Sequence, residues 1–411
     1  VESAQNGDGF AVQQRLGEEV KAVLLQAKQQ FSLERMGLSE RVRSLPWFHG
    51  YLSDTLIEQC LILDGDFALY ISSLDNLTLV IKHFYRFYRL IVTVNANNQI
   101  FVEHQDQQYG SPEELATQGK LRGVRLENNL IAYLKRPVSQ QIWQVTMEQL
   151  CLGDALGRRG RIFAGSITRV PTINVAAKVA KSPNDAIILM HECVILRKLI
   201  HPNIVRMCAV QTKQAPPILL MEMAITTVKQ HLSSAQVPVA GTELLRFCLE
   251  LAAAVDHVHS KWCVHGYLAA KNCLLTDQNK LKLTNFSLSF YGGFFRSDQT
   301  GIAVKWSAPE TLAYGAYTDR TDVWSYGVVL WEIWNEGKDP YVGMRDAEVK
   351  TKVLEGFRMD PGERMVGDVV LLMDKCWNNY PEKRPPLCRI HSLLNSLLIA
   401  VRTGRANANA I

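Results

Sequence analysis

The sequence lacks several features that would assign it to a class at once. It has no apolar run of ~20 residues, the length that a helix needs to span a membrane, and its most apolar stretches, such as Ser325–Trp334, are much shorter. It has no long run of lysine and arginine, and a net charge of +5 does not argue for nucleic-acid binding. We expect no membrane span, no signal peptide, and at most peripheral contact with a membrane surface. The first residue is Val1 and not methionine, which is compatible with a fragment or a processed form.

The cysteines also lack any pattern of pairing. Nine of them are scattered between Cys60 and Cys388, without a CxxC pair and without a Cys/His set at zinc spacing. An odd and dispersed set is typical of reduced thiols in the core of a cytosolic protein. We therefore expect a cytoplasmic location.

The composition that remains is that of a globular protein. The 411 residues are 47% apolar and 21% charged, which suits two or three folded domains. The mixture of strand and helix patterns along the chain indicates the α+β class. The predicted boundaries are an N-terminal segment with an amphipathic helix (1–46), a first domain (47–138), a linker (139–149), a second domain (150–401) divided into a small lobe (150–223) and a large lobe (224–401), and a tail (402–411).

Local patterns predict the elements within these boundaries. Apolar residues recur at helical spacing over Ala11–Met36, which indicates a helix packed on a neighbouring domain or the remnant of a coiled coil. Ser53–Leu63 is a predicted helix with Ser53 as its N-cap, and Ser111–Thr117 begins with Ser-Pro-Glu-Glu, a good helix start. Its predicted strands are Asp66–Ser72, Leu77–His83 and Arg89–Val94. The second domain is strand-rich with one helix after Pro183, and then helical from residue 224 onward, which predicts a ligand-binding cleft between two lobes.

Several motifs of the second domain resemble the protein-tyrosine-kinase domain. VAAK at Val175–Lys178 is similar to the strand that carries the phosphate-pairing lysine, and Glu192 lies where the family places the partner of that lysine. The remaining motifs follow in the family's order: HPNIVR at His201–Arg206, HGYLAAKN at His265–Asn272, WSAPE at Trp306–Glu310, DVWSYGVVLWEIW at Asp322–Trp334 and the Arg384-Pro385 pair. The resemblance implies a bilobal fold that binds ATP through Lys178, Glu192 and Met223, and an ion pair between Glu310 and Arg384.

The glycine-rich loop departs from the family pattern. Gly157 and Gly160 fall on the first and third family glycines, but Arg159 falls on the second, and about two residues are missing. Glycine is used in such loops because it lets the backbone approach phosphate closely. We expect Arg158 and Arg159 to lie in a solvated turn, with phosphate binding by their charge as the alternative.

The residues of the phosphoryl-transfer chemistry also depart from the pattern. Transfer needs a carboxylate base and a Mg²⁺ ion held by an acidic ligand. Tyr267 replaces the base, and a phenol keeps its proton at neutral pH. Asn272 retains a metal-ligand position, but Asn285 offers a neutral carbonyl where the family has an aspartate. Ser287 and Ala303 replace a glycine and a proline of the same region. The sequence therefore leaves ATP binding open, argues against Mg²⁺ and predicts impaired transfer.

The first domain resembles a Src-homology-2 domain, with a central antiparallel sheet flanked by two helices. WFHGYLSD at Trp47–Asp54 and GDFALYIS at Gly65–Ser72 carry the resemblance. Such domains bind phosphotyrosine through arginines, but Tyr70 and Asp54 stand at those two positions. Phosphotyrosine capture is therefore not expected. KHFYRFYR at Lys82–Arg89 indicates a solvated hairpin or an anion- or protein-binding surface. The order of domains resembles the Fes/Fer type of non-receptor kinase.

Three functions follow from these resemblances. The first is a pseudokinase scaffold that docks on protein partners, among them an active kinase relative. The second is a divergent active tyrosine kinase that uses Lys178, Glu192, Asn272 and Asn285. The third is an adaptor whose first domain recognises unphosphorylated protein.

Overall fold

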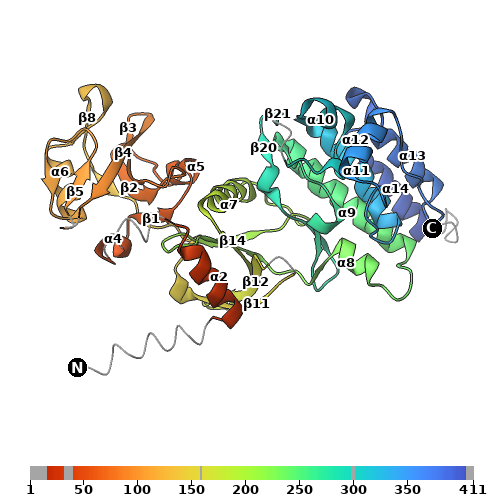
Figure 1. Cartoon of the computed structure of the whole chain (residues 1–411), viewed down its shortest axis with the longest axis horizontal. Coiled ribbons are helices and arrows are strands. Elements are labelled where there is room, and N and C mark those ends of the chain that lie inside the picture. Colours follow the sequence, from red (N-terminus) through yellow and green to blue (C-terminus); the bar gives the residue numbers. More distant parts are fainter. Residues whose placement is uncertain are drawn as a thin grey trace. The chain divides into compact units, whose positions relative to one another are not determined.

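The structure is a computed structural model, and it describes residues 16–31, 40–95, 97, 99–157, 160–297 and 301–403. Arg158, Arg159 and the outer parts of the predicted N-terminal helix lie outside the described residues. The chain divides into two compact units, Val1–Val194 with Met207–Met223 and Ile195–Arg206 with Ala224–Ile411. Figure 1 labels the helices and strands of the two units.

The first part of unit one is a sheet domain. Its strands run in the order β1-β2-β3-β4-β5-β6, with β9 also paired to β2. The strands are β1 (Phe48–Tyr51), β2 (Asp66–Ile71), β3 (Leu77–His83), β4 (Arg86–Val94), β5 (Ile100–Val102), β6 (Gln108–Tyr109) and β9 (Arg136–Pro137), and β7 (Val124–Arg125) pairs separately with β8 (Ile131–Ala132). The helices are α4 (Glu40–Ser44), α5 (Asp54–Glu58), α6 (Pro112–Leu121) and the 3₁₀ turn η1 (Glu127–Asn129).

The predicted N-cap at Ser53 and the predicted helix start at Ser111 are confirmed, although the first helix ends at Glu58, earlier than the predicted Leu63. The Ser53 hydroxyl accepts a hydrogen bond from the Leu56 amide at 3.4 Å, and the Ser111 hydroxyl accepts one from the Glu114 amide at 3.1 Å. Each bond satisfies an amide that has no partner within its own helix. The β3–β4 hairpin carries exposed Phe84 and Tyr85 at its turn, as the solvated alternative for Lys82–Arg89 predicts.

The second part of unit one is a six-stranded sheet with the order β10-β14-β15-β13-β12-β11. The strands are β10 (Gln144–Val145), β11 (Leu150–Ala155), β12 (Ile162–Ile167), β13 (Ile173–Val179), β14 (Met207–Gln211) and β15 (Ile218–Glu222), preceded by the 3₁₀ turn η2 (Met147–Gln149). The segment 139–149, expected to be only a linker, thus contributes a strand, because β10 pairs in parallel with β14.

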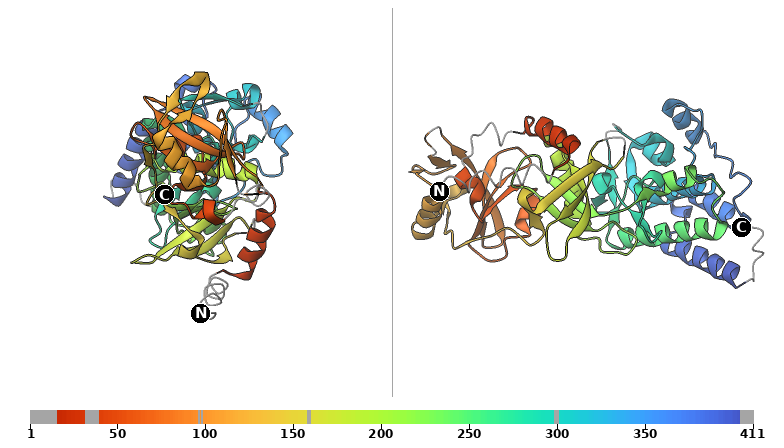
Figure 2. Two further views of the ribbon diagram at one scale, coloured as in Figure 1. Left: turned by 90° about the vertical axis from the view of Figure 1, so that its left-hand side faces the viewer. Right: turned by 90° about the horizontal axis from the view of Figure 1, so that it is seen from below.

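Two helices accompany this sheet. Helix α7 (Pro183–Leu196) begins at the predicted proline. Helix α2 (Glu18–Lys28) lies within the predicted N-terminal helical run and sits beside β11 (Figure 2). The core of this part is formed by alternate residues of the strands, among them Leu150, Phe163 and Val175, which are at most 1% exposed.

Unit two is mainly helical. Its helices are α8 (Val228–Ser233), α9 (Gly241–Ser260), α10 (Pro309–Tyr314), α11 (Asp319–Trp334), α12 (Asp346–Leu354), α13 (Gly367–Cys376) and α14 (Leu387–Arg402), with 3₁₀ turns η3 (Ala270–Asn272), η4 (Phe286–Leu288), η5 (Val304–Trp306) and η6 (Pro381–Lys383). Its short strands are β16 (Thr226–Thr227), β17 (Cys263–Val264), β18 (Cys273–Leu275), β19 (Leu281–Leu283), β20 (Phe290–Tyr291), β21 (Phe294–Arg296) and β22 (Ala316–Thr318).

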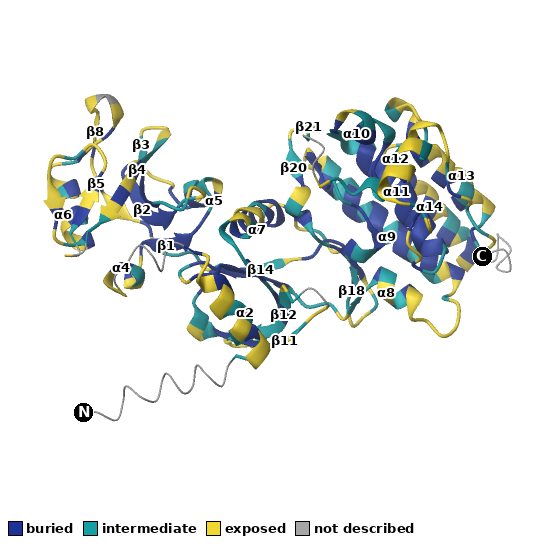
Figure 3. Ribbon diagram, viewed as in Figure 1, coloured by how far each residue is buried: buried dark blue, intermediate teal, exposed yellow. Residues whose placement is uncertain are grey.

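Helix α11 is the centre of unit two. Every residue from Thr321 to Trp334 is buried (Figure 3), and burial on every side explains why most of these residues are apolar. Thr318 and Thr321 start the helix with a capping box. In the part of the chain that the structure describes, we find no helix long and apolar enough to cross a membrane.

Candidate active site

Lys178 and Glu192 form an ion pair in unit one. Lys178 lies on β13, between β12 and β15, and its Nζ is 2.5 Å from Oε2 of Glu192 on α7. The Glu192 side chain is 1% exposed and the Lys178 side chain is 21% exposed. A buried carboxylate requires such a partner. Because an ammonium has three donors, Lys178 can also contact an anionic ligand, and the pair fits the nucleotide that the motif implies.

The glycine-rich turn lies at the end of β11. Gly157 has a φ of +92° and Gly160 a φ of +52°, values that glycine adopts readily and other residues rarely do. The Leu156 amide donates to the Ile162 carbonyl at 2.7 Å and closes the hairpin. Met223, the third nucleotide position implied by the motif, follows the last residue of β15. Gly157, Gly160 and Met223 all belong to unit one.

The catalytic-loop backbone is held by a buried carboxylate of α11. Asp322 is 1% exposed and accepts hydrogen bonds from the amides of His265 (2.7 Å) and Gly266 (2.9 Å). The buried His265 ring packs edge-to-face on Phe286 with 4.8 Å between centroids. These contacts fix the backbone conformation of the loop next to the position where the family has its base.

Tyr267 occupies that position. Its ring packs edge-on against Trp306 with 6.4 Å between centroids. The Lys271 Nζ lies 4.9 Å from the centroid of the Tyr267 ring and 4.5 Å from that of Trp306, which is cation–π geometry. The phenol is therefore part of an aromatic cluster with Trp306 and Lys271.

Asn272 and Asn285 are brought together, as the motif implies. The Asn285 Nδ2 donates to the Asn272 Oδ1 at 3.3 Å, and the Ser287 hydroxyl donates to the Asn285 Oδ1 at 2.9 Å. The Asn272 Nδ2 donates in turn to the Tyr267 carbonyl at 2.8 Å. Asn285 has a φ of +66°, a left-handed conformation that asparagine tolerates well. Both amide oxygens already accept a hydrogen bond, and neither is charged.

No alternative metal centre is found in the residues described. None of their His, Cys, Asp and Glu side chains form a group of three or more that could hold an ion. Mg²⁺ is bound in proteins chiefly through carboxylates, so the donors supplied by Asn272 and Asn285 fit it poorly.

Two site residues were missed from the sequence. Gly266 stands where protein kinases have the arginine of the H-R-D motif, has a φ of +76°, and would place a Cβ only 3.1 Å from the Leu288 carbonyl oxygen. The glycine in the HGYLAAKN motif is the sequence signal that could have identified this position.

Glu332 of α11 is fully buried and accepts hydrogen bonds from the Ala270 amide and the Trp306 Nε1, each at 2.9 Å. Burial raises the pKa of Glu332 to about 7. The sequence of α11 gives no sign that Glu332 accepts hydrogen bonds from the catalytic loop and from Trp306.

The predicted pair of Glu310 and Arg384 is confirmed. The Arg384 Nη1 lies 2.6 Å from Glu310 Oε1 and its Nη2 lies 2.8 Å from Oε2, so the contact is bidentate. Arg384 is 1% exposed. Such a fully hydrogen-bonded ion pair fixes the segment that follows Trp306 in the large lobe.

The sheet domain has a second cluster of polar residues at the positions expected to bind phosphate. The Tyr70 hydroxyl donates to Asp54 Oδ1 at 2.7 Å. Arg89 of β4 forms ion pairs with Asp54, at 3.2 Å, and with Glu58. Burial, with a smaller effect of the Asp54 carboxylate, raises the pKa of Tyr70 above its ordinary value. Arg89 and Glu58 were missed as partners because only folding brings them beside α5.

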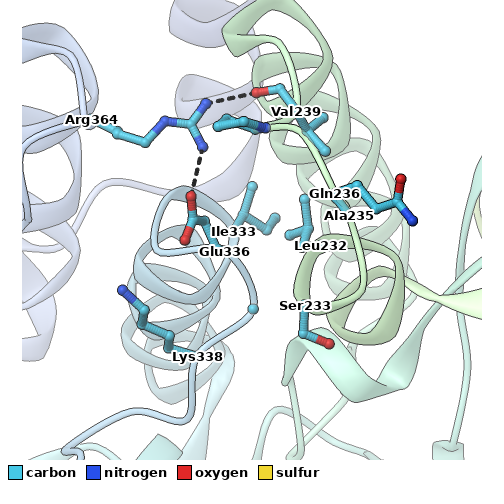
Figure 4. A pocket seen from close by; sticks show the side chains of 11 residues that line it. Leu232, Ser233, Ala235, Gln236, Val239, Ile333, Glu336, Lys338 and Arg364 are labelled. Carbon is cyan, nitrogen blue, oxygen red and sulfur yellow. Dashed lines mark hydrogen bonds and ion pairs between the residues drawn. The ribbon is translucent and has the colours of Figure 1, made fainter.

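A separate pocket of about 370 Å³ lies in unit two, and it is lined by none of the residues at the nucleotide, base or metal positions. Leu232 and Ile333 line its apolar side. Arg364 closes one edge by donating to the Val239 carbonyl at 2.7 Å and pairing with Glu336 at 3.5 Å (Figure 4). The pocket is therefore distinct from the positions at which the motifs place the phosphoryl-transfer chemistry.

Comparison with known families places the second domain. Residues 150–394 match the family described as protein tyrosine and serine/threonine kinase. The chain belongs to this protein-kinase family. As a member it has the bilobal kinase fold, and the family typically uses ATP with Mg²⁺.

The relatives refine the place of this kinase-family chain. It is 34% identical over 281 residues to the tyrosine-protein kinase transforming protein Fps of avian sarcoma virus (strain PRCII), which covers 66% of this chain and 51% of that protein. It is 29% identical over 372 residues to the tyrosine-protein kinase Fer of Mus musculus, covering 85% of this chain and 43% of that protein. Fer-related kinase 1 of Caenorhabditis elegans is 27% identical over 382 residues, covering 87% of this chain and 95% of that protein.

These matches identify a tyrosine-kinase-like protein of the Fes/Fer type. The chain spans about half or less of the length of the Fps and Fer proteins.

Proposed function

We propose that this protein is a signalling member of the tyrosine-kinase family in which phosphoryl transfer is impaired and the kinase domain serves as a docking scaffold. One observation carries the proposal. The base position holds Tyr267, whose ring packs against Trp306, and the metal position holds Asn285, whose amide bonds to Asn272 and Ser287.

The chemistry of transfer gives this observation its weight. A positioned base contributes roughly 10²–10⁴ to a rate, and the family's metal neutralises the charge that develops on the transferred phosphoryl group. A phenol cannot supply a carboxylate's basicity at neutral pH. Two hydrogen-bonded amides cannot supply the negative charge that draws Mg²⁺ from water. Both deficits act on the same step.

Nucleotide binding is a separate property, and we propose that it is retained without a metal requirement. Lys178 is held by Glu192 at 2.5 Å and remains partly exposed. An ammonium in this position can pair with the phosphates of ATP. The glycine-rich turn is short, so we expect binding to be weaker than with a full loop that supplies backbone amides to phosphate.

The test is a transfer assay with radiolabelled ATP and a tyrosine peptide, carried out on wild type and on Lys178→Met. We expect wild type to label the peptide no faster than Lys178→Met. Labelling by wild type that Lys178→Met abolishes would contradict the scaffold proposal.

That second outcome would support a divergent active kinase, the alternative function. A specific observation favours it: the Lys178–Glu192 pair is formed, and Phe286 is buried against His265. The framework for transfer of the ATP γ-phosphate to protein tyrosine is thus retained. In this alternative Asn272 and Asn285 hold the metal through their carbonyl oxygens.

For the sheet domain we propose a Src-homology-2-like module that binds protein independently of phosphate. The support is the internal network of Tyr70, Asp54, Arg89 and Glu58, in which the one arginine is already paired with two carboxylates. The partner would be an unphosphorylated protein, and an active kinase relative is a suitable candidate. The nine free cysteines support a cytoplasmic location for such a complex.

A further inference from the structure

Helix α2 forms part of the core of the small-lobe sheet, although it precedes the sheet domain in sequence. Val20 is fully buried in the same cluster as Leu150, Leu152 and Phe163. Val23 and Leu24 of the helix, and Leu16 just before it, pack against this cluster. One side of a helix that lies more than 100 residues earlier in the chain therefore packs on the small-lobe sheet.

The start of α2 is also bonded to the backbone of β11. The Gly17 amide donates to the Leu152 carbonyl at 2.8 Å, and Leu16 forms a parallel bridge with Leu152. A Cβ on Gly17 would lie 3.3 Å from the Gly153 carbonyl oxygen, so glycine permits this close approach. The backbone pairing thus fixes the start of α2 on β11, while the side chains of the helix pack on the core of the sheet.

That strand leads directly into the glycine-rich turn. β11 ends at Ala155, and Gly157 follows two residues later. On the other side of the turn, a Cβ on Gly160 would lie 4.0 Å from the Glu19 carboxylate in the first turn of α2. Helix α2 therefore lies next to the turn on its entry strand and near its exit.

The far end of α2 is anchored in the sheet domain. Phe31 is fully buried and packs edge-to-face on Tyr51 of β1, with 5.1 Å between ring centroids. Tyr51 also donates its amide to the Thr212 carbonyl at 2.9 Å, beside β14. The segment from Leu16 to Phe31 thus has one end on the small-lobe sheet and the other on the sheet domain.

We propose that α2 is a strut that holds β11 and the glycine-rich turn in position and couples them to the sheet domain. Release of either end of α2 then loosens the turn. This inference rests on the proposed function only in that the turn receives the nucleotide phosphates. The coupling itself is measurable without nucleotide or transfer, so a failure of either idea can be told from a failure of the other.

The test is amide hydrogen exchange of the full chain, read by mass spectrometry. Val20→Asp places a carboxylate in the core under β11. Leu25→Asp is the matched control, because Leu25 lies on the same helix and is 64% exposed. We expect Val20→Asp to speed exchange over residues 151–157 by about tenfold or more, through local opening. We expect Leu25→Asp to leave those rates unchanged, and neither variant to alter exchange in α11.

Two milder variants keep the test decisive if Val20→Asp unfolds the small lobe. Val20→Ala should speed exchange over 151–157 by a smaller factor. Val20→Ile keeps a β-branched apolar side chain, and exchange over 151–157 should stay at the wild-type rate. Phe31→Ala cuts the far anchor and should also speed exchange over 151–157. Unchanged exchange there in Val20→Ala would overturn the strut. An effect of Phe31→Ala confined to β1 would overturn the coupling.

Discussion

The phenol of Tyr70 donates a 2.7 Å hydrogen bond to the carboxylate of Asp54. Both residues stand at positions where the proposed likeness to a Src-homology-2 domain implies arginine. The pair fills the polar cluster with a neutral donor and an anion, and Arg89 is drawn to Asp54 and Glu58. A phosphate approaching this cluster meets two carboxylates and one engaged arginine.

We predict that Tyr70→Arg combined with Asp54→Arg creates phosphate-dependent peptide binding. Two charge-assisted bonds at roughly 1.5–3 kcal/mol each correspond to a gain of about 10²–10⁴ in affinity. Fluorescence anisotropy with a peptide in phosphorylated and unphosphorylated form measures it. Tyr70→Phe is the matched control, since it removes the hydroxyl without adding charge. Phosphate-dependent binding by wild type would contradict this account of the cluster.

We predict that ATP raises the melting temperature of wild type equally in EDTA and in Mg²⁺, because binding to the folded state stabilises it and the site supplies no carboxylate for the ion. Lys178→Met should abolish the shift. Lys338→Met, at an exposed position of the large lobe, should leave it unchanged. A shift that appears only with Mg²⁺ would show that Asn272 and Asn285 do bind the metal.

Restoring the two acidic groups should restore transfer. Tyr267→Asp with Asn285→Asp and Ser287→Gly returns the base, the metal ligand and the hinge glycine. We expect the rate of peptide labelling to rise above that of wild type by a factor of roughly 10²–10⁴, which is what a positioned base contributes. Tyr267→Phe with the same two changes supplies the metal ligand without the base, and should stay slow. Equal rates for the two triple variants would contradict the role assigned to position 267.

Buried Glu332 gives a pH dependence of stability. Its pKa is raised from 4.5 to about 7, so the folded state holds its proton where the unfolded chain has released it. The favourable contribution is complete below pH 4.5 and is lost as pH rises through 7, by about 3 kcal/mol. Glu332→Gln keeps an acceptor for Trp306 but does not titrate. We expect the free energy of unfolding of wild type, relative to Glu332→Gln, to fall between pH 5 and pH 8 in urea titrations.

Tyr291 should be a poor phosphorylation site. Its ring lies under Lys198, with 4.9 Å from Nζ to the centroid, and its buried hydroxyl has no hydrogen-bond partner among the residues described. Burial raises its pKa to about 12. An active tyrosine kinase added in trans should modify Tyr85, which is 98% exposed, at least tenfold faster than Tyr291. Peptide mass spectrometry over time decides it, and rapid modification of Tyr291 in folded protein would refute the prediction.

Local signals in the sequence predicted more of this molecule than non-local ones. Ser53 and Ser111 mark helix starts because capping depends on a few adjacent residues. The pairs Lys178–Glu192 and Glu310–Arg384 could be named in advance because the motif order carries their contacts. By contrast, a two-residue strand such as β10 shows no alternation that a pattern could reveal.

The contacts that were not foreseen join distant parts of the chain. Arg89 meets Asp54 and Glu58 only when β4 folds beside α5. The predicted packing of the N-terminal helix on a neighbouring domain is confirmed by α2, and only its partner strand β11 was not foreseen. Glu332 reads as one polar residue in an apolar helix. Its partners, the Ala270 amide and the Trp306 indole, are visible only in three dimensions.

The two backbone bonds that Asp322 accepts from His265 and Gly266 have a consequence for how such a protein changes. Through them a helix outside the loop fixes the path of the loop, and the amide groups that it holds are present in every residue except proline. Substitutions within the loop can therefore abolish a reaction without disturbing the architecture around it. In such a fold the backbone path of the catalytic loop and the side chains that react on it can change independently. A protein can therefore lose the reactive side chains and keep the loop in place.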